Sequence, residues 1–384
     1  MSNISSLSQC ANCGACYNSC PTGAIRVDGE GLFYRVAVDR EKCANCGKCL
    51  QICPVNSPEM HQNLLSAYYG VNKDHEIVKN SSSGGAFSAI ANCILEDGGI
   101  VFGACFDDDF RKVVIRSTDE VPLSKLLKSK YVESLVGDSF SHVKYQLSTG
   151  RQVLYCGSPC QIVGLKRFLG QEYKNLYTCD FTCGGFPSHE MYRTYIDTLE
   201  KRRKSAVTKV DFRPKTLGWE TYAIQICFDK GLAYHSPAAL DPFFSAFLRK
   251  HYSVRESCLN CQFSDNHFSD IILSDFWRYR EFAVSEKMPE GISLVITNSD
   301  RGEELLERAS ANFPHGRLDL QKAAYNIKKI SFPHDFYGDR NCFLECYQSY
   351  GLWKAAKRYC VPPAFKVFVI KVKSVFKYLF RRVK

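Results

Sequence analysis

The pattern of apolar and polar positions predicts a helix soon after residue 80. In "NSSSGGAFSAIANCILEDGGIVFGACFD", a Ser/Gly stretch (Ser81 to Gly85) precedes apolar residues at three- and four-residue steps: Phe87, Ile90, Ala91, Ile94 and Leu95. A Ser/Gly loop that opens a helix presents backbone N–H groups to which a phosphate can bind. Because Ser and Gly are also common helix caps, the loop alone leaves a nucleotide site and a plain cap open.

Two later stretches have the pattern of a strand followed by a helix. In "RQVLYCGSPCQIVGLKRFL" (151–169) an apolar run and a turn lead to a helix, with Pro159 suited to its first turn. The stretch "NLYTCDFTCGGFPSHEMYRTYIDTLEKRR" (175–203) repeats this order, with Ser188 placed to cap the helix. The alternation predicts a βαβ unit, and hence an α/β body with a partly parallel sheet.

The C-terminal segment predicts a basic amphipathic helix after Pro362 and Pro363. On a helical wheel one face is apolar and the opposite flank is basic. The apolar positions are Phe365, Phe368, Val372, Val375, Phe376, Leu379 and Val383, and the basic ones are Lys366, Lys373, Lys377, Arg381 and Lys384. The segment is too short and too charged to span a bilayer. It suits either peripheral contact with the inner membrane surface or docking on the chain's own body or a partner.

Composition and charge narrow the class of protein. A chain of 384 residues with 45% apolar and 23% charged residues is typical of a globular protein with two or three domains. The net charge of +10 comes from the C-terminal segment, since no acidic residue follows Glu345. A nucleic-acid surface would normally lie on a folded domain, so we expect no nucleic-acid partner. The N-terminus lacks a secretory signal, so we expect a cytoplasmic protein whose 20 cysteines are reduced and serve as metal or redox ligands.

Eight cysteines form two nearly identical runs with the spacing C-x2-C-x2-C-x3-C-P. The first run is Cys10, Cys13, Cys16 and Cys20, and the second is Cys43, Cys46, Cys49 and Cys53. In two-cluster ferredoxins the fourth cysteine of each run binds the other cluster. We therefore assign one 4Fe–4S cluster to Cys10, Cys13, Cys16 and Cys53, and a second to Cys43, Cys46, Cys49 and Cys20. Zinc also binds C-x2-C pairs, but zinc sites rarely have this doubled run. The runs predict an α+β, ferredoxin-like module over residues 1–60.

Six further cysteines offer a third site. Two pairs, Cys156 with Cys160 and Cys179 with Cys183, are expected at the turns after the two predicted strands, where ligands bind in open α/β sheets. A C-x2-C pair, Cys258 and Cys261, follows later in the chain. Two cysteines from the turns and this pair would complete a third four-thiolate site, for zinc or for an iron–sulfur cluster.

Taken together, these stretches resemble one known family. The order is the Ser-Gly-Gly loop, "KSKYVES" (128–134), "GSPCQIVGLKRFL", "CGGFPSHEMY" and "CLNCQF" leading to "SDIILSDFW". It resembles the beta-subunit family of the coenzyme F420-reducing hydrogenases and dehydrogenases, whose members are iron–sulfur flavoproteins. The resemblance covers about residues 66–335. It divides them into an N-terminal part with the flavin phosphate loop (66–148) and a C-terminal part with a third cluster (149–335), before a helical basic tail (336–384).

The resemblance also implies site residues. It implies an FAD held partly by Ser82, Ser83, Gly84 and Gly85, with Lys130 and Tyr131 close to the flavin. It implies a third 4Fe–4S cluster on Cys160, Cys183, Cys258 and Cys261, with Cys156 and Cys179 as second choices. The chain departs from the family at 183–185, where Cys-Gly-Gly stands in place of the usual Cys-His-Gly. A proton-donating role at that position is therefore in doubt.

These features predict an oxidoreductase that passes electrons between its clusters and FAD. Its substrate would be a small organic molecule or the deazaflavin coenzyme F420, and its redox partner would be ferredoxin or another redox protein. Two alternatives stay open: an electron-transfer subunit of a larger complex with no substrate of its own, and a non-catalytic cluster-bearing scaffold or redox sensor. The sequence identifies no catalytic residue.

Overall fold

The computed structural model describes residues 4, 7, 9–56, 64–282, 290–325, 332–333 and 335–382, with the side chains of 378–382 left out. The side chains of Leu379 and Arg381, and the whole of Val383 and Lys384, therefore lie outside what is described. Among the described residues, no helix has the length and apolar character needed to cross a membrane.

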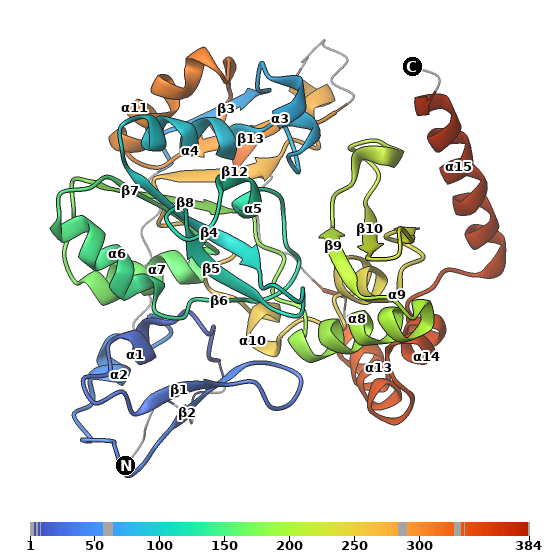
Figure 1. Cartoon of the computed structure of the whole chain (residues 1–384), viewed down its shortest axis with the longest axis horizontal. Helices are drawn as coiled ribbons and strands as arrows, with labels where there is room; N and C mark the ends of the chain where they lie inside the picture. The colour runs from blue at the N-terminus through green and yellow to red at the C-terminus, as the bar shows by residue number, and fades with distance from the viewer. Residues whose placement is uncertain are drawn as a thin grey trace.

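The described residues up to Asn56 form a small α+β module (Figure 1). It contains helices α1 (Ala15–Asn18) and α2 (Lys48–Gln51) and an antiparallel pair of strands, β1 (Ile25–Asp28) and β2 (Arg35–Val38). Each helix begins after the glycine of one cysteine run: Gly14 has φ of 90° and Gly47 has φ of 72°. This left-handed conformation favours glycine, which explains why both runs have glycine at the same place.

The body is built on a nine-stranded mixed sheet in the order β14-β3-β13-β12-β8-β7-β4-β5-β6. The pairs joining β12, β8, β7 and β4 are parallel, as is β5 with β6, and the remaining pairs are antiparallel. The strands are β3 (Ser66–Gly70), β4 (Ile100–Phe106), β5 (Val113–Ser117), β6 (Ser134–Leu135), β7 (Val153–Cys156), β8 (Leu176–Phe181), β12 (Ile271–Asp275), β13 (Ser293–Thr297) and β14 (His315–Leu318). The predicted α/β body with a partly parallel sheet is confirmed.

Helices cover both faces of this sheet (Figure 1). On one face α4 (Ala86–Glu96) and α11 (Asp300–Arg308) share an apolar cluster with the strands. On the other, α6 (Ser139–Ser148) and α7 (Pro159–Leu169) form a second cluster. Shorter helices join the strands: α3 (His75–Lys79), α5 (Leu123–Leu126), α10 (Glu256–Leu259), α12 (Leu320–Ala324), η4 (Tyr279–Phe282) and η5 (Ala309–Ala311).

The predicted strand–helix units are present. Strand β7 leads into α7, whose first residue is Pro159, and the parallel strand β8 leads into α8 (His189–Arg203). The Ser188 hydroxyl caps α8 by accepting the Met191 N–H at 3.1 Å. One expectation was wrong: Cys156 and Cys179 do not lie in the turns, because Cys156 is the last residue of β7 and Cys179 lies inside β8, where the two residues pair.

A second, aromatic-rich unit adjoins the main sheet and was not anticipated from the sequence. Its three-stranded antiparallel sheet has the order β11-β10-β9. The members of this unit besides α8 are β9 (Val207–Asp211), η2 (Lys215–Leu217), β10 (Ala223–Phe228), β11 (Ala233–Pro237), α9 (Pro242–Phe244), η3 (Ser245–Arg249), α13 (Phe336–Tyr350) and α14 (Leu352–Tyr359). The last helix, α15 (Ala364–Arg382), lies at the edge of the molecule beyond this sheet (Figure 1).

Candidate cluster sites and flavin pocket

The first predicted set of cysteines lies around one cavity. Cys10, Cys13, Cys16 and Cys53 line it, together with apolar side chains such as Val36 and Val55. Burial raises the pKa of Cys13 to about 12, and the neighbouring thiols of Cys10 and Cys53 contribute to this rise. The structure therefore brings together three thiols of the first run and the last thiol of the second, the combination that the ferredoxin spacing predicts.

The second set is gathered less closely. Cys20 and Cys49 pack against the same apolar cluster, whereas Cys46 is exposed. Burial raises the pKa of Cys20, but hydrogen bonds from the Thr22 side chain and from backbone N–H groups at Thr22, Ala24 and Ile25 outweigh it and lower the pKa overall. Such N–H groups stabilise a thiolate, which is the form that binds iron. With Cys43, this set remains a prediction.

The third set comes from three separate parts of the chain. Cys160 lies in the first turn of α7, Cys183 follows β8, and Cys258 and Cys261 belong to α10 and the loop after it. Burial raises the pKa of Cys160 well above its usual range, and the nearby thiols of Cys261 and Cys183 add to the rise. Burial likewise raises the pKa of Cys183 to about 12, with Cys261 again contributing.

The second-choice cysteines lie apart from this group. Cys156 and Cys179 face each other across β7 and β8, and a hydrogen bond between their thiols is the main cause of the raised pKa of Cys179. The arrangement favours Cys160 and Cys183 as the partners of the C-x2-C pair.

Closely packed, buried thiols fit a multi-iron cluster. Four thiolates in such surroundings repel one another and need a bound cation to stabilise them. Within the described ranges, no three Cys, His, Asp or Glu side chains are placed to hold a single metal ion. A cubane cluster has a different requirement, because its thiolates are spread over several irons.

The first and third sets are neighbours. The Cys160 Sγ lies 3.9 Å from the carbonyl oxygen of Ala11, and the Ser257 hydroxyl donates to the carbonyl of Cys10 at 2.9 Å. One apolar cluster contains Cys13 and Cys160, with Cys258 and Cys261 packed against it. The helix α7 approaches so closely that a Cβ on Gly164 would lie 2.7 Å from the Cys13 carbonyl oxygen.

A buried ion pair links the first and third cysteine sets. The sequence analysis did not anticipate it. The Arg255 guanidinium donates to both oxygens of Glu133 at 2.7 Å and to the carbonyl of Tyr34 at 2.7 Å. The Asn12 side chain also donates to Glu133, at 2.9 Å. Arg255 and Glu133 are only 8% and 1% exposed. The pair thus ties the module (Asn12, Tyr34) to the segment just before Cys258.

The N-terminus of α8 also holds the module. The Ser188 hydroxyl, which caps the helix, donates to the carbonyl of Leu32 at 2.7 Å. The imidazole of His189 stacks on the Tyr34 ring with centroids 3.7 Å apart, and its Nε2 lies 3.0 Å from the Gly29 carbonyl. Burial lowers the pKa of His189. This histidine therefore packs between the module and α8.

The Ser-Gly loop is pinned by its own contacts. Ser82 Oγ accepts the Ser129 N–H at 2.7 Å, Ser83 Oγ donates to the Ile292 carbonyl at 2.6 Å, and the Gly84 N–H donates to Ser293 Oγ at 3.0 Å. A Cβ on Gly84 would lie 2.5 Å from the Gly70 carbonyl oxygen. The loop thus has a packing role in addition to any role in phosphate binding.

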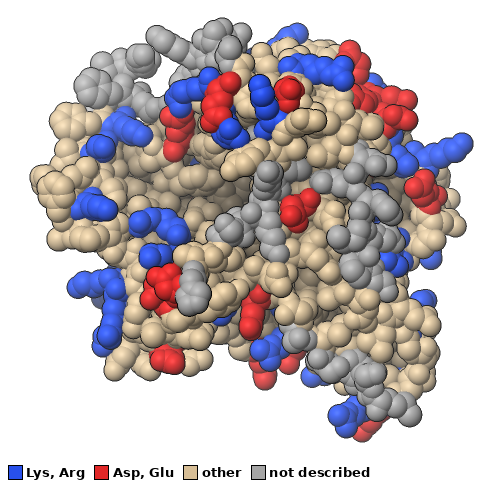
Figure 2. Space-filling model, turned by 180° about the vertical axis from the view of Figure 1, so that it is seen from behind, with Lys and Arg blue, Asp and Glu red and all other residues tan. Residues whose placement is uncertain are grey.

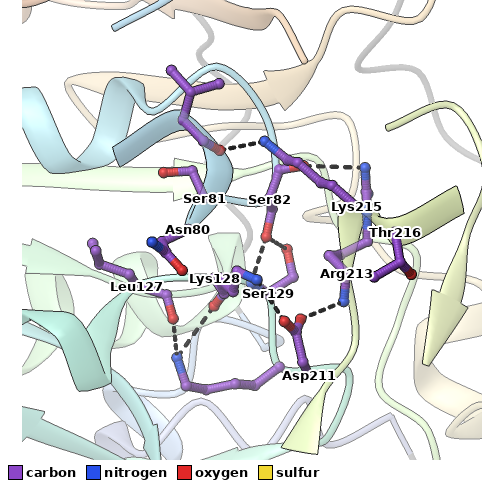
Figure 3. A network of polar contacts seen from close by, with 12 residues as sticks. Asn80, Ser81, Ser82, Leu127, Lys128, Ser129, Asp211, Arg213, Lys215 and Thr216 are labelled. Atoms are coloured by element: carbon purple, nitrogen blue, oxygen red, sulfur yellow. Dashed lines mark hydrogen bonds and ion pairs between the residues drawn. The ribbon is translucent and has the colours of Figure 1, made fainter. Parts of the chain in front are cut away.

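Two basic side chains from the segment that follows β9 contact this loop (Figure 3). Arg213 donates to the Ser82 carbonyl at 3.2 Å and pairs with Asp275 at 2.7 Å, while Lys215 donates to the Ser83 carbonyl at 2.8 Å. Burial lowers the pKa of Lys215 to about 7. Nothing in the local sequence pattern marked Arg213 or Lys215, since both lie about 130 residues beyond the loop that they contact.

A cavity of about 420 Å³ opens next to this network, within the size range of small-molecule sites. Its lining combines aromatic rings with charged groups, namely Phe106, Phe110, Phe212, Lys125, Lys128, Lys130, Lys209, Asp107, Asp108 and Asp211, and Asn80 and Ser129 border the Ser-Gly loop. Lys128 pairs with Asp211 at 2.6 Å. Positive charge beside flat apolar rings suits a ligand with phosphates and an aromatic ring system.

Of the residues expected to contact the flavin, only Lys130 lines the cavity. Lys130 lines the cavity, its Nζ donates to the Leu127 carbonyl at 2.7 Å, and burial lowers its pKa to about 8. Tyr131 instead packs against Phe212 and Phe244. Ser82, Ser83, Gly84 and Gly85 are outside the lining, although Ser82 contacts Ser129, which belongs to it.

These features define a class: an α/β protein whose body carries a docked cysteine-rich module and a separate cavity lined by aromatic and charged side chains. The chain belongs to the coenzyme F420 hydrogenase/dehydrogenase beta subunit family. The model of that family's N-terminal part matches residues 67–137, and the model of its C-terminal part matches residues 150–323. A 4Fe-4S dicluster domain model matches residues 9–57.

The chain is also similar to chains of solved structures. No curated protein matches the chain. Among solved structures, a chain in a xenon-derivatised F420-reducing [NiFe] hydrogenase complex from Methanosarcina barkeri is 17% identical. The alignment covers 80% of this chain and 99% of that chain, with a TM-score of 0.47.

Proposed function

We propose that the protein is an iron–sulfur flavoprotein oxidoreductase. Three 4Fe–4S clusters and one FAD would carry electrons between ferredoxin, or another redox protein, and a small organic substrate or coenzyme F420. The observation that carries this proposal is the run of contacts along 128–133. Lys128 and Lys130 line the cavity, and Glu133 holds Arg255 next to the third cysteine set. One short segment therefore connects the cavity to the cysteines.

The described residues have distinct roles in this proposal. A flavin exchanges two electrons with organic substrates and single electrons with clusters. The basic groups lining the cavity would neutralise its phosphates, and the rings of Phe106 and Phe212 would pack against its ring system. Cys46, which is exposed, would place the second cluster nearest an external partner. The first set would then face the third across α7 and Gly164.

Metal and flavin analysis of protein purified without oxygen tests the proposal. We expect about twelve irons, matching sulfide and one FAD per chain. Cys160→Ser should leave about eight irons with FAD retained. The matched control is Cys342→Ser, since Cys342 is exposed on α13 and lies outside the three sets. About eight irons with zinc and no flavin in the parent protein would contradict the proposal and leave a scaffold or sensor.

An activity assay separates an enzyme from an electron-transfer subunit. With reduced ferredoxin or a reduced viologen as donor, we expect the isolated chain to reduce F420 or another organic acceptor. Rapid reduction of the bound flavin without turnover of any acceptor would instead favour a subunit whose chemistry takes place in a partner.

A further inference from the structure

The C-terminal helix α15 contacts the rest of the protein through one side only. It packs beside η2, and the Lys377 Nζ donates to the Thr221 hydroxyl at 2.5 Å. Of the half-buried residues of α15, Val367, Ile370 and Ser374 lie on this same side of the helix, whereas Val369 and Val372 lie among the exposed groups of the other side. These contacts fix which face of α15 is directed toward the body.

The opposite side of α15 carries large exposed apolar groups. Phe365 is 77% exposed, Phe368 is 65% exposed and Val375 is 57% exposed. At 100° per residue these side chains fall within one sector, roughly opposite Ile370 and Ser374. An amphipathic helix that served only to pack on its own protein would bury this stripe. In Figure 1 the outer side of α15 faces away from the body.

Basic residues flank the apolar stripe on both sides. Lys371 lies on one flank and Lys366 and Lys373 lie on the other, all three exposed. Acidic groups are absent from the sequence after Glu345, so no carboxylate of this segment neutralises them. Figure 2, which views the molecule from behind, shows basic and acidic side chains interspersed over the main body. Between Phe365 and Val375, by contrast, α15 carries three exposed lysines and no Asp or Glu.

We infer that this face of α15 binds the surface of an anionic phospholipid bilayer. Lysines on both flanks of an apolar stripe that contains Phe365 and Phe368 match the two layers of a membrane surface. The rings enter the acyl boundary while the lysine stems extend to the phosphates. Charge complementarity favours this occupant over a second copy of the chain, because two such faces would repel each other. The inference does not depend on the redox chemistry proposed above.

Flotation of the full chain with lipid vesicles tests the inference. We expect binding to phosphatidylcholine vesicles that contain about one third phosphatidylserine, and much weaker binding to phosphatidylcholine alone. Binding should weaken when salt is raised from about 0.1 M to about 1 M, because the Debye length falls from about 10 Å to about 3 Å. The double variant Phe365→Ser/Phe368→Ser should lose at least about tenfold in affinity.

Matched variants separate the apolar contribution to vesicle binding from the electrostatic one. Lys366→Glu/Lys373→Glu should weaken binding to anionic vesicles and leave the residual binding to neutral vesicles unchanged. Tyr145→Ser and Lys174→Glu are the controls, because both residues are exposed and belong to the α6–α7 side of the main sheet. All these side chains are exposed, so the unfolding midpoint should stay constant.

Two results would overturn the inference. One is a parent protein that stays unbound with anionic vesicles at low salt. The other is an oligomer that Phe365→Ser/Phe368→Ser converts to a monomer while lipid binding is absent, which would assign the stripe to a second copy of the chain.

Discussion

At the scale of single residues, Gly164 shows how closely the module meets the body. Glycine in the middle of a helix costs about 1 kcal/mol relative to alanine, so its presence in α7 calls for a reason. The reason is the approach of Cys13: a Cβ at position 164 would lie 2.7 Å from its carbonyl oxygen and 3.2 Å from its sulfur. Space for the module takes precedence over helix propensity here.

Gly164→Ala should therefore destabilise the protein by about 1–3 kcal/mol, since the added methyl must displace backbone. It should also lower the iron content by disturbing Cys13. The control is Gly338→Ala in α13, where a Cβ would meet nothing within 4 Å and a small gain in stability is expected. Urea unfolding and iron analysis measure both. A Gly164→Ala protein more stable than the parent would show that the module can shift to make room for the added methyl group.

The buried pair of Arg255 and Glu133 gives a second prediction. Removing one charge leaves the other buried without its partner, so Glu133→Gln should cost about 3–5 kcal/mol. The double variant Glu133→Gln/Arg255→Met should be less destabilised than the sum of the two single variants, because it leaves no isolated charge. A double-mutant cycle measured by urea unfolding checks this. Additive effects would mean that the two side chains act independently.

In the proposed flavin site, Lys130 would make flavin binding depend on pH. Burial holds its pKa at about 8, below the usual value, with Asp211 partly opposing this and Lys128 adding to it. The charged form, present below pH 8, is the one that attracts a phosphate. Bound FAD would favour that form and move its pKa upward. We therefore expect the FAD dissociation constant to rise as the pH is raised above about 8, and Lys130→Met to flatten this rise. Equilibrium titrations of the flavin at several pH values measure it.

At the scale of secondary-structure elements, α8 shows one residue with two tasks. Ser188 caps the helix through the Met191 N–H and also donates to Leu32 of the module. Ser188→Ala should cost about 1–2 kcal/mol through loss of the cap. Asp74→Ala, which removes the cap of the short helix α3, is the control. Only Ser188→Ala should speed amide hydrogen exchange around residues 29–34. Equal exchange rates in the two variants would mean that Ser188 caps α8 but does not hold the module.

Helix starts marked by a capping residue or a proline could be predicted from the sequence. Strand ends and contacts between distant residues could not. Pro159 and Ser188 mark the starts of α7 and α8 correctly, because a helix start depends on neighbours in the sequence. The position of Cys179 inside β8 was missed, since a strand end carries no comparable signal. The contacts of Arg255 with Glu133 and of Arg213 with Ser82 join residues 122 and 131 positions apart, and a single sequence holds no record of them.

At the scale of the whole molecule, the three cysteine sets differ in their access to solvent. Cys13 of the first set and Cys160, Cys258 and Cys261 of the third share one apolar cluster, whereas Cys46 of the second set is exposed. Oxidants and chelators should therefore release about four irons first, from the second set, with the third set protected longest. Stopped-flow iron release and EPR measure the order. In Cys46→Ser the early phase should disappear, and its persistence would contradict this order.

The separation of the third set along the chain has a consequence for biogenesis. Cys53 completes the first two sets early in synthesis, but Cys261 emerges from the ribosome only 208 residues later. At about 5–20 residues per second, this interval lasts about 10–40 s. The proposed cluster assignment thus implies two loading events. Iron can enter the N-terminal module while translation continues, but the third cluster must wait until α7, β8 and α10 have come together. Cells short of iron should then accumulate a partly loaded protein with a filled module and an empty third site.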